Sequence, residues 1–336
     1  MIVPVFNREA VVGEAVASLA RQTLEDMEII VVDDGSSDSS ADVAEAAARG
    51  KPVRVIRHPN NRGIPAARNT GLQAARSGYI AWLDSDDLAR PQRLERQVNF
   101  LARHLDVALV GAAAGRLDAQ GRPKRRTRVP FLTHETLAPA LLFRSPFQQS
   151  SIMGRAEVLK AFEYRPEFPV CEDLDMFIRI SRQHRLANLK EVLIDRRLHQ
   201  GQIGRVESAQ VRHLKGVLLR DLLGRLGIEP SELDLDRHTT LGAPKKQPQS
   251  RQFIAWAESW MKTLESANDK ARYYDPRGLA LVCARTWANA CLASMRGNQR
   301  LHVGASLVGS SLTLGFANAY GAEWVAAALP GLLGIG

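Results

Sequence analysis

The chain has 336 residues, of which 45% are hydrophobic, and its 45 basic and 36 acidic side chains give a net charge of +9. This length fits one large domain with a smaller one, or two domains of ordinary size. The charge favours anionic partners, but no recognised nucleic-acid-binding motif accompanies it, so we expect no nucleic-acid partner. The three cysteines show neither metal-site spacing nor a disulfide framework, and no signal peptide pattern follows the first residue. We therefore expect a cytoplasmic location.

The first part of the chain alternates between short apolar strands and amphipathic helices. The second strand, Met27–Val32, has the continuous apolar character of a parallel strand that is covered on both faces. Such alternation with short loops predicts an α/β fold with a parallel, doubly wound sheet. The strands are expected at residues 2–5, 27–32, 53–56 and 79–83, and the helices between them at 9–21, 39–49 and 65–75.

Acidic residues follow two of these strands. Asp33 and Asp34 end the second strand, and Asp84, Asp86 and Asp87 come directly after the fourth. In an open α/β sheet, the carboxyl ends of the strands form the edge where ligands bind. Crowded carboxylates suit Mg²⁺ or Mn²⁺, with substrate phosphates completing the coordination shell. The alternative is an acidic turn that caps the helix after it.

Two further features fit a site at this edge. Arg68 lies early on the third helix, where its charge could offset that of phosphates. Glu172 and Asp173 open a helix whose apolar positions begin at Leu174. Acidic residues in a first helical turn are favoured by the helix dipole alone. The functional interpretation is that one of them is a catalytic carboxylate presented at the helix start.

Beyond residue 205 the pattern becomes helical. Helices are predicted at residues 206–226, 251–265 and 277–295, and a Gly- and Pro-containing polar segment, 239–250, is expected to be a linker or exposed loop. We therefore predict a catalytic domain at 1–205 and a helical region at 206–336. The apolar segment 303–336 is almost free of charge. It is expected to pack on the catalytic domain, to form a homodimer interface, or to contact a membrane surface.

The motifs, taken together and in order, resemble those of the family 2 glycosyltransferases, which have the GT-A fold. The resemblance covers about residues 1–205. Each motif is weak alone, and the order and spacing carry the resemblance. The matching motifs are VPVFN at 3–7, IVVDDGSSD at 30–38, NRG at 61–63, AARNTG at 66–71, LDSDD at 83–87, ED at 172–173 and RLHQGQ at 197–202.

The resemblance implies an inverting transfer of a sugar from a nucleotide-diphosphate sugar, with UDP as the default nucleotide, to a hydroxyl of a saccharide or lipid-linked saccharide. It implies a Rossmann-like GT-A domain, a mostly parallel sheet flanked by helices, with a helical C-terminal extension. Mn²⁺ or Mg²⁺ would be the cofactor, and polysaccharide or cell-envelope synthesis the setting. A lipid-linked acceptor would favour the inner face of the cytoplasmic membrane.

The same resemblance assigns roles to individual residues. Asp173 matches the catalytic base, with Glu172 as a substitute. Asp84 and Asp86 fill the Asp-x-Asp motif, with Asp86 as the direct metal ligand, and His199 matches a position that can approach the metal or the diphosphate. The residues implied in nucleotide binding are Pro4, Val5, Phe6, Asn7, Asp34, Arg68, Asp84 and Ser85.

Two other functions remain open from the sequence. One is a catalytically inactive GT-A-like protein that binds a polymer or a membrane. The other is a metal-dependent phosphohydrolase with a nucleophilic aspartate at Asp33 or Asp34. Such enzymes separate the nucleophile from the second acid by one residue, whereas here the two acids are adjacent.

Overall fold

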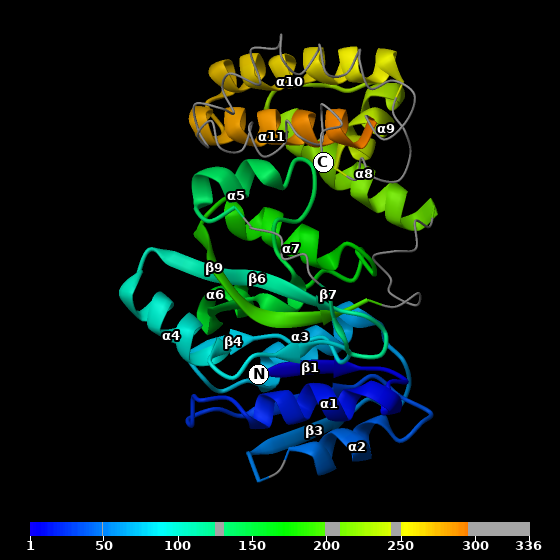
Figure 1. Cartoon of the computed structure of the whole chain (residues 1–336), viewed down its shortest axis with the longest axis vertical. Coiled ribbons are helices and arrows are strands. Elements are labelled where there is room, and N and C mark those ends of the chain that lie inside the picture. The colour runs from blue at the N-terminus through cyan, green and yellow to red at the C-terminus, as the bar shows by residue number, and fades with distance from the viewer. Residues whose placement is uncertain (49, 125–130, 199–208, 243–249, 295–336) are drawn as a thin grey trace, which may run out of the picture. The chain divides into compact units, whose positions relative to one another are not determined.

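A computed structural model describes residues 1–48, 50–124, 131–198, 209–242 and 250–294 (Figure 1). The chain forms two compact units. The first comprises residues 1–137 and 145–211, and the second comprises 138–144 and 212–336. The predicted domain boundary at residue 205 lies outside the described residues and stays a prediction.

Three parallel strands form the first sheet of the first unit, in the order β1-β2-β3. The register places Val3 opposite Val31 and Val5 opposite Asp33. The strands therefore end together, and Asp34 follows at their carboxyl edge. The elements of this half are β1 (Ile2–Val5), α1 (Glu9–Ala20), β2 (Ile29–Asp33), α2 (Ser40–Ala47), β3 (Val53–Arg57) and α3 (Ile64–Ala74).

Helices cover both faces of this sheet, which explains why β1 and β2 are almost wholly apolar. On one face, Val12 and Val16 of α1 share a buried cluster with Val3 and Val31. On the other face α3 approaches β1 closely, because a Cβ added at Gly71 would lie only 2.4 Å from Ile2 Cγ2. A glycine on α3 thus permits the close contact that brings this helix to the sheet.

The second sheet is mixed. Its order is β4-β8-β6-β9-β5, with β7 paired to β6. The β6–β9 pair is parallel, whereas β8 is antiparallel to both β4 and β6. The α/β fold is as predicted, but the strict alternation behind the parallel sheet stops after β4, so this half is not doubly wound. The strands are β4 (Tyr79–Ala81), β5 (Leu88–Ala89), β6 (Val107–Leu117), β7 (Pro123–Lys124), β8 (Met153–Arg155) and β9 (Arg185–Arg197).

The two sheets meet where β4 ends. Trp82 forms an isolated parallel bridge with Ile2, and Leu83 N–H donates to Ile2 O at 3.0 Å. Beneath this junction the fully buried Arg93 donates from Nη2 to Trp82 O at 2.8 Å and to Ile152 O at 3.2 Å. The residues after Leu83 are thereby held near the edge at which β1 and β2 end.

The first unit has further helices, which lie against the second sheet or carry residues of the site. Those used below are α4 (Arg93–Arg103), the 3₁₀ turn Gln149–Ser151, α6 (Ala156–Ala161) and α7 (Glu172–Ser181). The predicted helix at residue 172 is therefore present, with Glu172 as its first residue.

The second unit is helical. Its helices include α9 (Glu232–Leu241), α10 (Arg251–Ala271) and α11 (Pro276–Ser294), and α8 (Ala209–Arg225) begins just before it. Ser231 and Ser250 cap α9 and α10 by accepting backbone N–H bonds. Helix α9 continues to Leu241, so the predicted linker at 239–250 starts too early. The threonine and glycine residues at the start of that segment are not typical of a helix interior, and the sequence therefore did not indicate the last helical turn.

His238 is the polar centre of the core of this unit. Its Nδ1 accepts from Trp260 Nε1 at 2.8 Å, its Nε2 lies 2.6 Å from Leu142 O, and its ring stacks on Phe143. Segment 138–144 is thus anchored to α9 and α10 through one buried imidazole.

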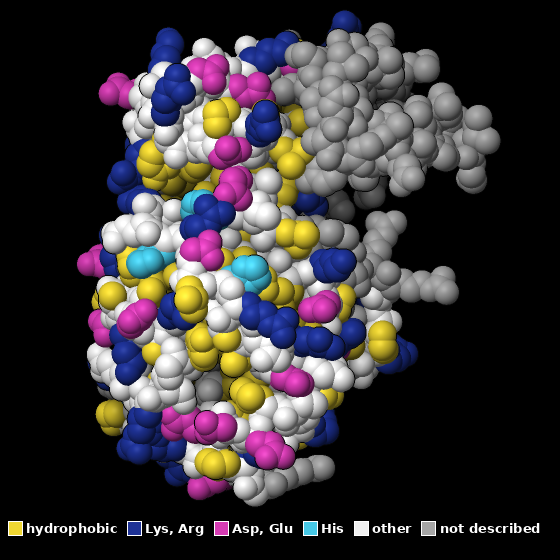
Figure 2. Space-filling view, turned by 90° about the vertical axis from the view of Figure 1, so that its left-hand side faces the viewer, with side chains coloured by type: hydrophobic (Ala, Val, Ile, Leu, Met, Phe, Trp, Pro, Cys, Tyr) yellow, Lys and Arg dark blue, Asp and Glu magenta, His cyan; other side chains and the backbone are white. Residues whose placement is uncertain are grey.

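Among the described helices, none is long and apolar enough to cross a membrane. Acidic and basic side chains are interspersed across much of the face drawn in Figure 2. Segment 303–336, which was expected to make a packing, dimer or membrane contact, lies outside the described residues.

Candidate active site

The turn after β1 and the loop after β2 are joined at the sheet edge. Asn7 adopts a positive φ of 50°, donates its N–H to Ser36 Oγ at 2.9 Å and accepts Ser37 N–H on Oδ1 at 2.9 Å. Among the predicted nucleotide-binding residues here, Val5 is buried and Phe6 is exposed. Pro4 is half-buried in β1. The structure thus brings the turn at 4–7 against the loop that carries Asp34.

Asp34 is buried and held by several donors. Its Oδ1 accepts from Arg62 N–H at 3.0 Å and lies 2.6 Å from His58 Nδ1. Its Oδ2 accepts from Gly63 N–H at 2.8 Å. A carboxylate oxygen has room for about two donors. Oδ2 therefore keeps the capacity to accept one more hydrogen bond.

The acidic segment after β4 forms a tight turn. Asp87 N–H donates to Asp84 O at 3.1 Å, with Ser85 and Asp86 at the centre of the turn. Ser150 lies beneath it, where its Oγ accepts Asp84 N–H at 3.1 Å and donates to Asp87 Oδ2 at 2.5 Å. Of the two central residues, Ser85 is buried and Asp86 is half-buried.

Asp87 points away from solvent and holds the turn in place. It is buried, and its Oδ1 accepts the N–H of Arg197 at 3.0 Å. Burial raises the pKa of Asp87 to about 8, and the neighbouring Asp84 and Asp86 add to that rise. The Arg197 side chain in turn donates to Asp86 O at 3.2 Å and to Glu14 at 2.7 Å. Both oxygens of Asp87 are thus engaged inside the protein, so this geometry suits metal binding by Asp87 less than by Asp84 and Asp86.

Arg68 joins the two acidic parts of the site. The side chain of this residue on α3 is only 6% exposed. Its Nη2 donates to Asp84 Oδ1 at 3.2 Å, and its Nη1 lies 2.8 Å from Glu172 Oε1. The guanidinium also lies over the Tyr164 ring, 5.3 Å from its centroid. A buried cation with two carboxylates keeps these charges together where isolated charges would be costly.

The helix start at α7 carries the second acidic pair. Cys171 precedes it in a left-handed conformation, with φ 62°, and Asp173 Oδ1 accepts Leu174 N–H at 2.7 Å. Burial raises the pKa of Glu172 to about 7, while Arg68 opposes the rise and Asp173 adds to it. Burial likewise raises the pKa of Asp173, again against the effect of Arg68. A raised pKa suits a group that must take up a proton.

Two of the three residues expected to bind a metal, Asp84 and Asp86, lie within the described ranges. The Asp84 side chain is 37% exposed, so it and the half-buried Asp86 offer oxygen ligands that suit Mg²⁺ or Mn²⁺ when phosphates complete the shell. Within the described ranges, no group of three or more metal-ligating side chains occurs. His199, the third predicted ligand, lies outside those ranges.

Comparisons with known proteins identify the family of this chain. Residues 1–162 match the family model described as glycosyl transferase family 2. The chain is 31% identical over 199 residues to the amylovoran biosynthesis glycosyltransferase AmsE of Erwinia amylovora, covering 58% of this chain and 74% of AmsE. The chain belongs to the family 2 glycosyltransferases.

Two further likenesses extend this finding. An uncharacterized glycosyltransferase of Haemophilus influenzae is 28% identical over 244 residues, which cover 68% of this chain and 75% of that protein. Among solved structures, S. aureus TarS residues 1–349 in complex with UDP-GlcNAc aligns with a TM-score of 0.54 and 18% identity, covering 87% of this chain and 89% of that one. At this identity the TarS likeness shows the fold, which is GT-A-like.

Family membership also decides between the alternatives raised by the sequence. The chain is a transferase, so the phosphohydrolase interpretation is wrong. The geometry gives a physical reason, because Asp34 is engaged by three donors and Asp33 Oδ1 accepts Ser36 N–H at 3.2 Å. Both carboxylates are buried and hydrogen-bonded within the loop.

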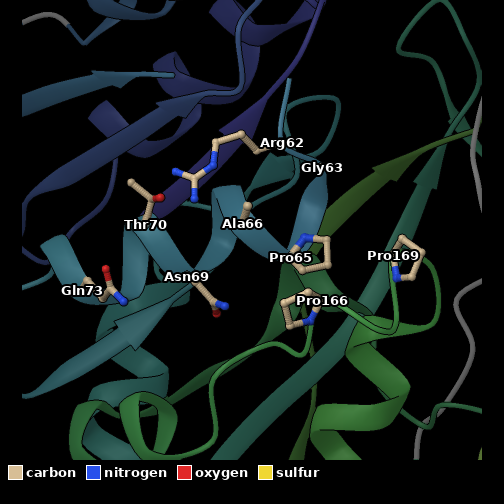
Figure 3. A pocket seen from close by; sticks show the side chains of 9 residues that line it. All are labelled: Arg62, Gly63, Pro65, Ala66, Asn69, Thr70, Gln73, Pro166 and Pro169. Atoms are coloured by element: carbon tan, nitrogen blue, oxygen red, sulfur yellow. The ribbon is translucent and has the colours of Figure 1, made fainter. Parts of the chain in front are cut away.

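A pocket of about 300 Å³ lies beside the site of this glycosyltransferase (Figure 3). It lies between α3 and the loop that leads to α7. Asn69 closes one side by donating to Tyr164 O at 2.7 Å and accepting Tyr164 N–H at 2.8 Å. The lining residues are Arg62, Gly63, Pro65, Ala66, Asn69, Thr70, Gln73, Pro166 and Pro169.

Several residues of this glycosyltransferase site were missed by sequence reasoning. Tyr164, under Arg68, lies in a loop with no motif, and Ser150 belongs to a 3₁₀ turn that no motif marks. His58 and Arg197 lie within matched or neighbouring segments, but a role in holding Asp34 or Asp87 requires knowledge of the fold. No signal in a single sequence identifies these contacts.

Proposed function

We propose that this glycosyltransferase moves a sugar, with inversion, from a UDP-sugar to a hydroxyl group of a saccharide or lipid-linked saccharide in polysaccharide or cell-envelope synthesis. The observation that carries the proposal is the contact of Arg68 with both Asp84 and Glu172. This contact supports the proposal, because it joins an acid expected to bind the donor to one of the pair expected to act on the acceptor.

The names of similar proteins support the choice of substrates. TarS binds UDP-GlcNAc in a solved structure, and AmsE is named for amylovoran biosynthesis. The donor would lie along the carboxyl edge of the sheet, with its base against the turn at 4–7 and Asp34. Ser85, in the turn after β4, would lie near the ribose and the phosphates.

Asp173 is the proposed general base. Because its Oδ1 accepts Leu174 N–H, Oδ2 is the atom that would take the proton of the acceptor hydroxyl. The acceptor oxygen then bonds to the anomeric carbon as the bond from that carbon to the diphosphate breaks. Glu172, which is paired with Arg68, would keep a negative charge beside this cation. It is also the substitute for Asp173 as general base.

The proposed metal site consists of Asp86 and Asp84, with His199 as a further ligand. A bound Mn²⁺ or Mg²⁺ would offset negative charge on the departing diphosphate. Arg68 would orient Asp84 toward this site through the contact described above.

Calorimetric titration with UDP, GDP and dTDP, with and without Mn²⁺, tests the proposal. We expect one nucleotide to bind in a metal-dependent way, and the binding to be lost in Asp86→Ala. Asp106→Ala is the matched control, because Asp106 is an exposed acid whose partner is Arg185. A folded protein that binds none of the nucleotides would refute the proposed function.

A further inference from the structure

His58 forms a hydrogen-bonded chain with Asp34 and Thr70 that the proposed reaction does not use. Its Nδ1 lies 2.6 Å from Asp34 Oδ1 and its Nε2 lies 2.9 Å from Thr70 Oγ1. The side chains of His58 and Asp34 are each only 5% exposed. The chain therefore runs from the sheet edge, through a buried imidazole, to a hydroxyl on α3.

The directions of these bonds follow for a neutral imidazole beside an ionised carboxylate. An ionised carboxylate only accepts hydrogen bonds, so the imidazole hydrogen lies on Nδ1 and is donated to Asp34. In the neutral ring Nε2 is then an acceptor, and the Thr70 hydroxyl donates to it. Thr70 lies on the wall of the pocket in Figure 3, on the side of His58 that faces away from Asp34.

This hydrogen-bonded series of side chains determines which hydrogen bonds Asp34 can make to a ligand. Oδ1 is occupied by His58 and by Arg62 N–H, whereas Oδ2 has only Gly63 N–H among the donors described above. Oδ2 is therefore the atom of this carboxylate that has room to accept a further hydrogen bond. An acceptor at this position complements a base edge that carries an N–H group. Uracil has such a donor at N3, whereas cytosine has an acceptor at the same position.

We propose that His58, oriented by Thr70, is a positioning residue that makes the site select uracil over cytosine by keeping Asp34 a fixed hydrogen-bond acceptor. The inference rests on the proposed function, in which Asp34 meets the nucleotide base. It adds two residues that determine base selectivity without touching the base.

The test compares UDP and CDP affinity by calorimetry in the full-length protein. Asparagine places its amide nitrogen near the position of His58 Nδ1, and glutamine places its amide near that of Nε2. His58→Asn can therefore keep the donor to Asp34, whereas His58→Gln keeps the contact with Thr70 and loses that donor. The ratio of the two affinities is the readout, because a general loss of folding lowers both affinities together.

We expect the wild type to prefer UDP and His58→Gln to reduce the UDP:CDP ratio about tenfold, the effect of one charge-assisted hydrogen bond. His58→Asn should retain the ratio within about threefold, and Thr70→Val should reduce it less than His58→Gln does. His104→Gln, a change at an exposed histidine stacked on Phe100, is the control and should leave the ratio unchanged.

Asp34→Asn separates failure of this inference from failure of the proposed function. If the wild type prefers UDP and Asp34→Asn abolishes that preference, but His58→Gln keeps the wild-type ratio, the role of His58 is refuted and the function stands. If Asp34→Asn keeps the wild-type ratio, Asp34 does not meet the base and the inference fails. A wild type that binds neither nucleotide overturns both.

Discussion

Arg68 Nη1 lies 2.8 Å from Glu172 Oε1, and the same guanidinium reaches Asp84 through Nη2. The two carboxylates come from a turn after β4 and from the start of α7. A single buried cation thus sets the electrostatic environment of both acidic pairs. Since removing one partner of a buried ion pair leaves the others uncompensated, changes at Arg68 should affect both halves of the site.

Replacing Arg68 tests this shared dependence. In Arg68→Gln the acids lose their cation, so the pKa of Asp173, which Arg68 lowers, should rise further. We expect kcat/KM to fall about 100-fold at neutral pH, from about 3 kcal/mol of lost stabilisation. The acid limb of the pH–rate profile should move to higher pH. Arg68→Lys keeps the charge but not the two-pronged contact.

Arg68→Lys should therefore have an activity between those of the wild type and Arg68→Gln, with a smaller shift of the acid limb. If Arg68→Gln lowers activity without moving the pH profile, Arg68 acts on substrate binding rather than on the carboxylates.

Glu172→Gln should shift the pH–rate profile in the opposite direction. Glu172 has a pKa of about 7, raised first by burial, and it is coupled electrostatically to Asp173. Removing its negative charge should favour the ionised form of Asp173, so the base stays active at lower pH. We expect the acid limb of kcat/KM to move down by about one pH unit, as a change of about 1.4 kcal/mol implies.

Asp173→Asn is the matched control for this measurement. It should lower kcat by about 10²–10⁴-fold, the contribution of a general base, without weakening UDP binding. If Glu172→Gln causes the larger loss and Asp173→Asn retains activity, the two residues exchange roles.

The sequence predicted the first half of the fold because each element there is complete in itself. An apolar strand such as Ile29–Asp33 and an amphipathic helix such as α1 follow from local periodicity, and the order of elements implies the parallel sheet. The second half depends on pairing between distant segments. Strand β8 has only three residues, and nothing local shows that it lies antiparallel between β4 and β6.

The candidate site shows the same division. The motifs located Asp34, Asp84 and Asp173, since each follows a strand or begins a helix. They could not show that Asp87 turns inward to Ser150 and Arg197, because that contact depends on the meeting of the turn, the 3₁₀ segment and β9. Adjacent acids in one motif thus have different surroundings, which only the fold distinguishes.

Asp87 should matter for stability rather than for direct ligand contact. Asp87→Ala leaves the Ser150 hydroxyl and the Arg197 N–H without their acceptor in a buried place, so we expect a loss of about 2–3 kcal/mol in the free energy of unfolding. Asp87→Asn can still accept from Arg197 and donate to Ser150, and should cost less than about 1 kcal/mol. Urea unfolding measures both; equal losses in the two variants would contradict the assigned contacts.

His238 should make the stability of the helical unit depend on pH. Burial lowers the pKa of His238 to about 4 from an ordinary value of 6.5. The unfolded chain therefore binds a proton as pH falls through 6.5, whereas the folded protein resists until about pH 4. The contribution of the neutral His238 to the free energy of unfolding is fully present above pH 6.5. It is lost between pH 6.5 and pH 4, by about 3 kcal/mol in total. Urea unfolding followed by tryptophan fluorescence measures this loss, since Trp260 contacts the imidazole.

His238→Gln should be less stable at pH 7 and lack this dependence of stability on pH, while His213→Gln, at an exposed site on α8, should keep it. An unchanged slope in His238→Gln would assign the acid sensitivity to other groups.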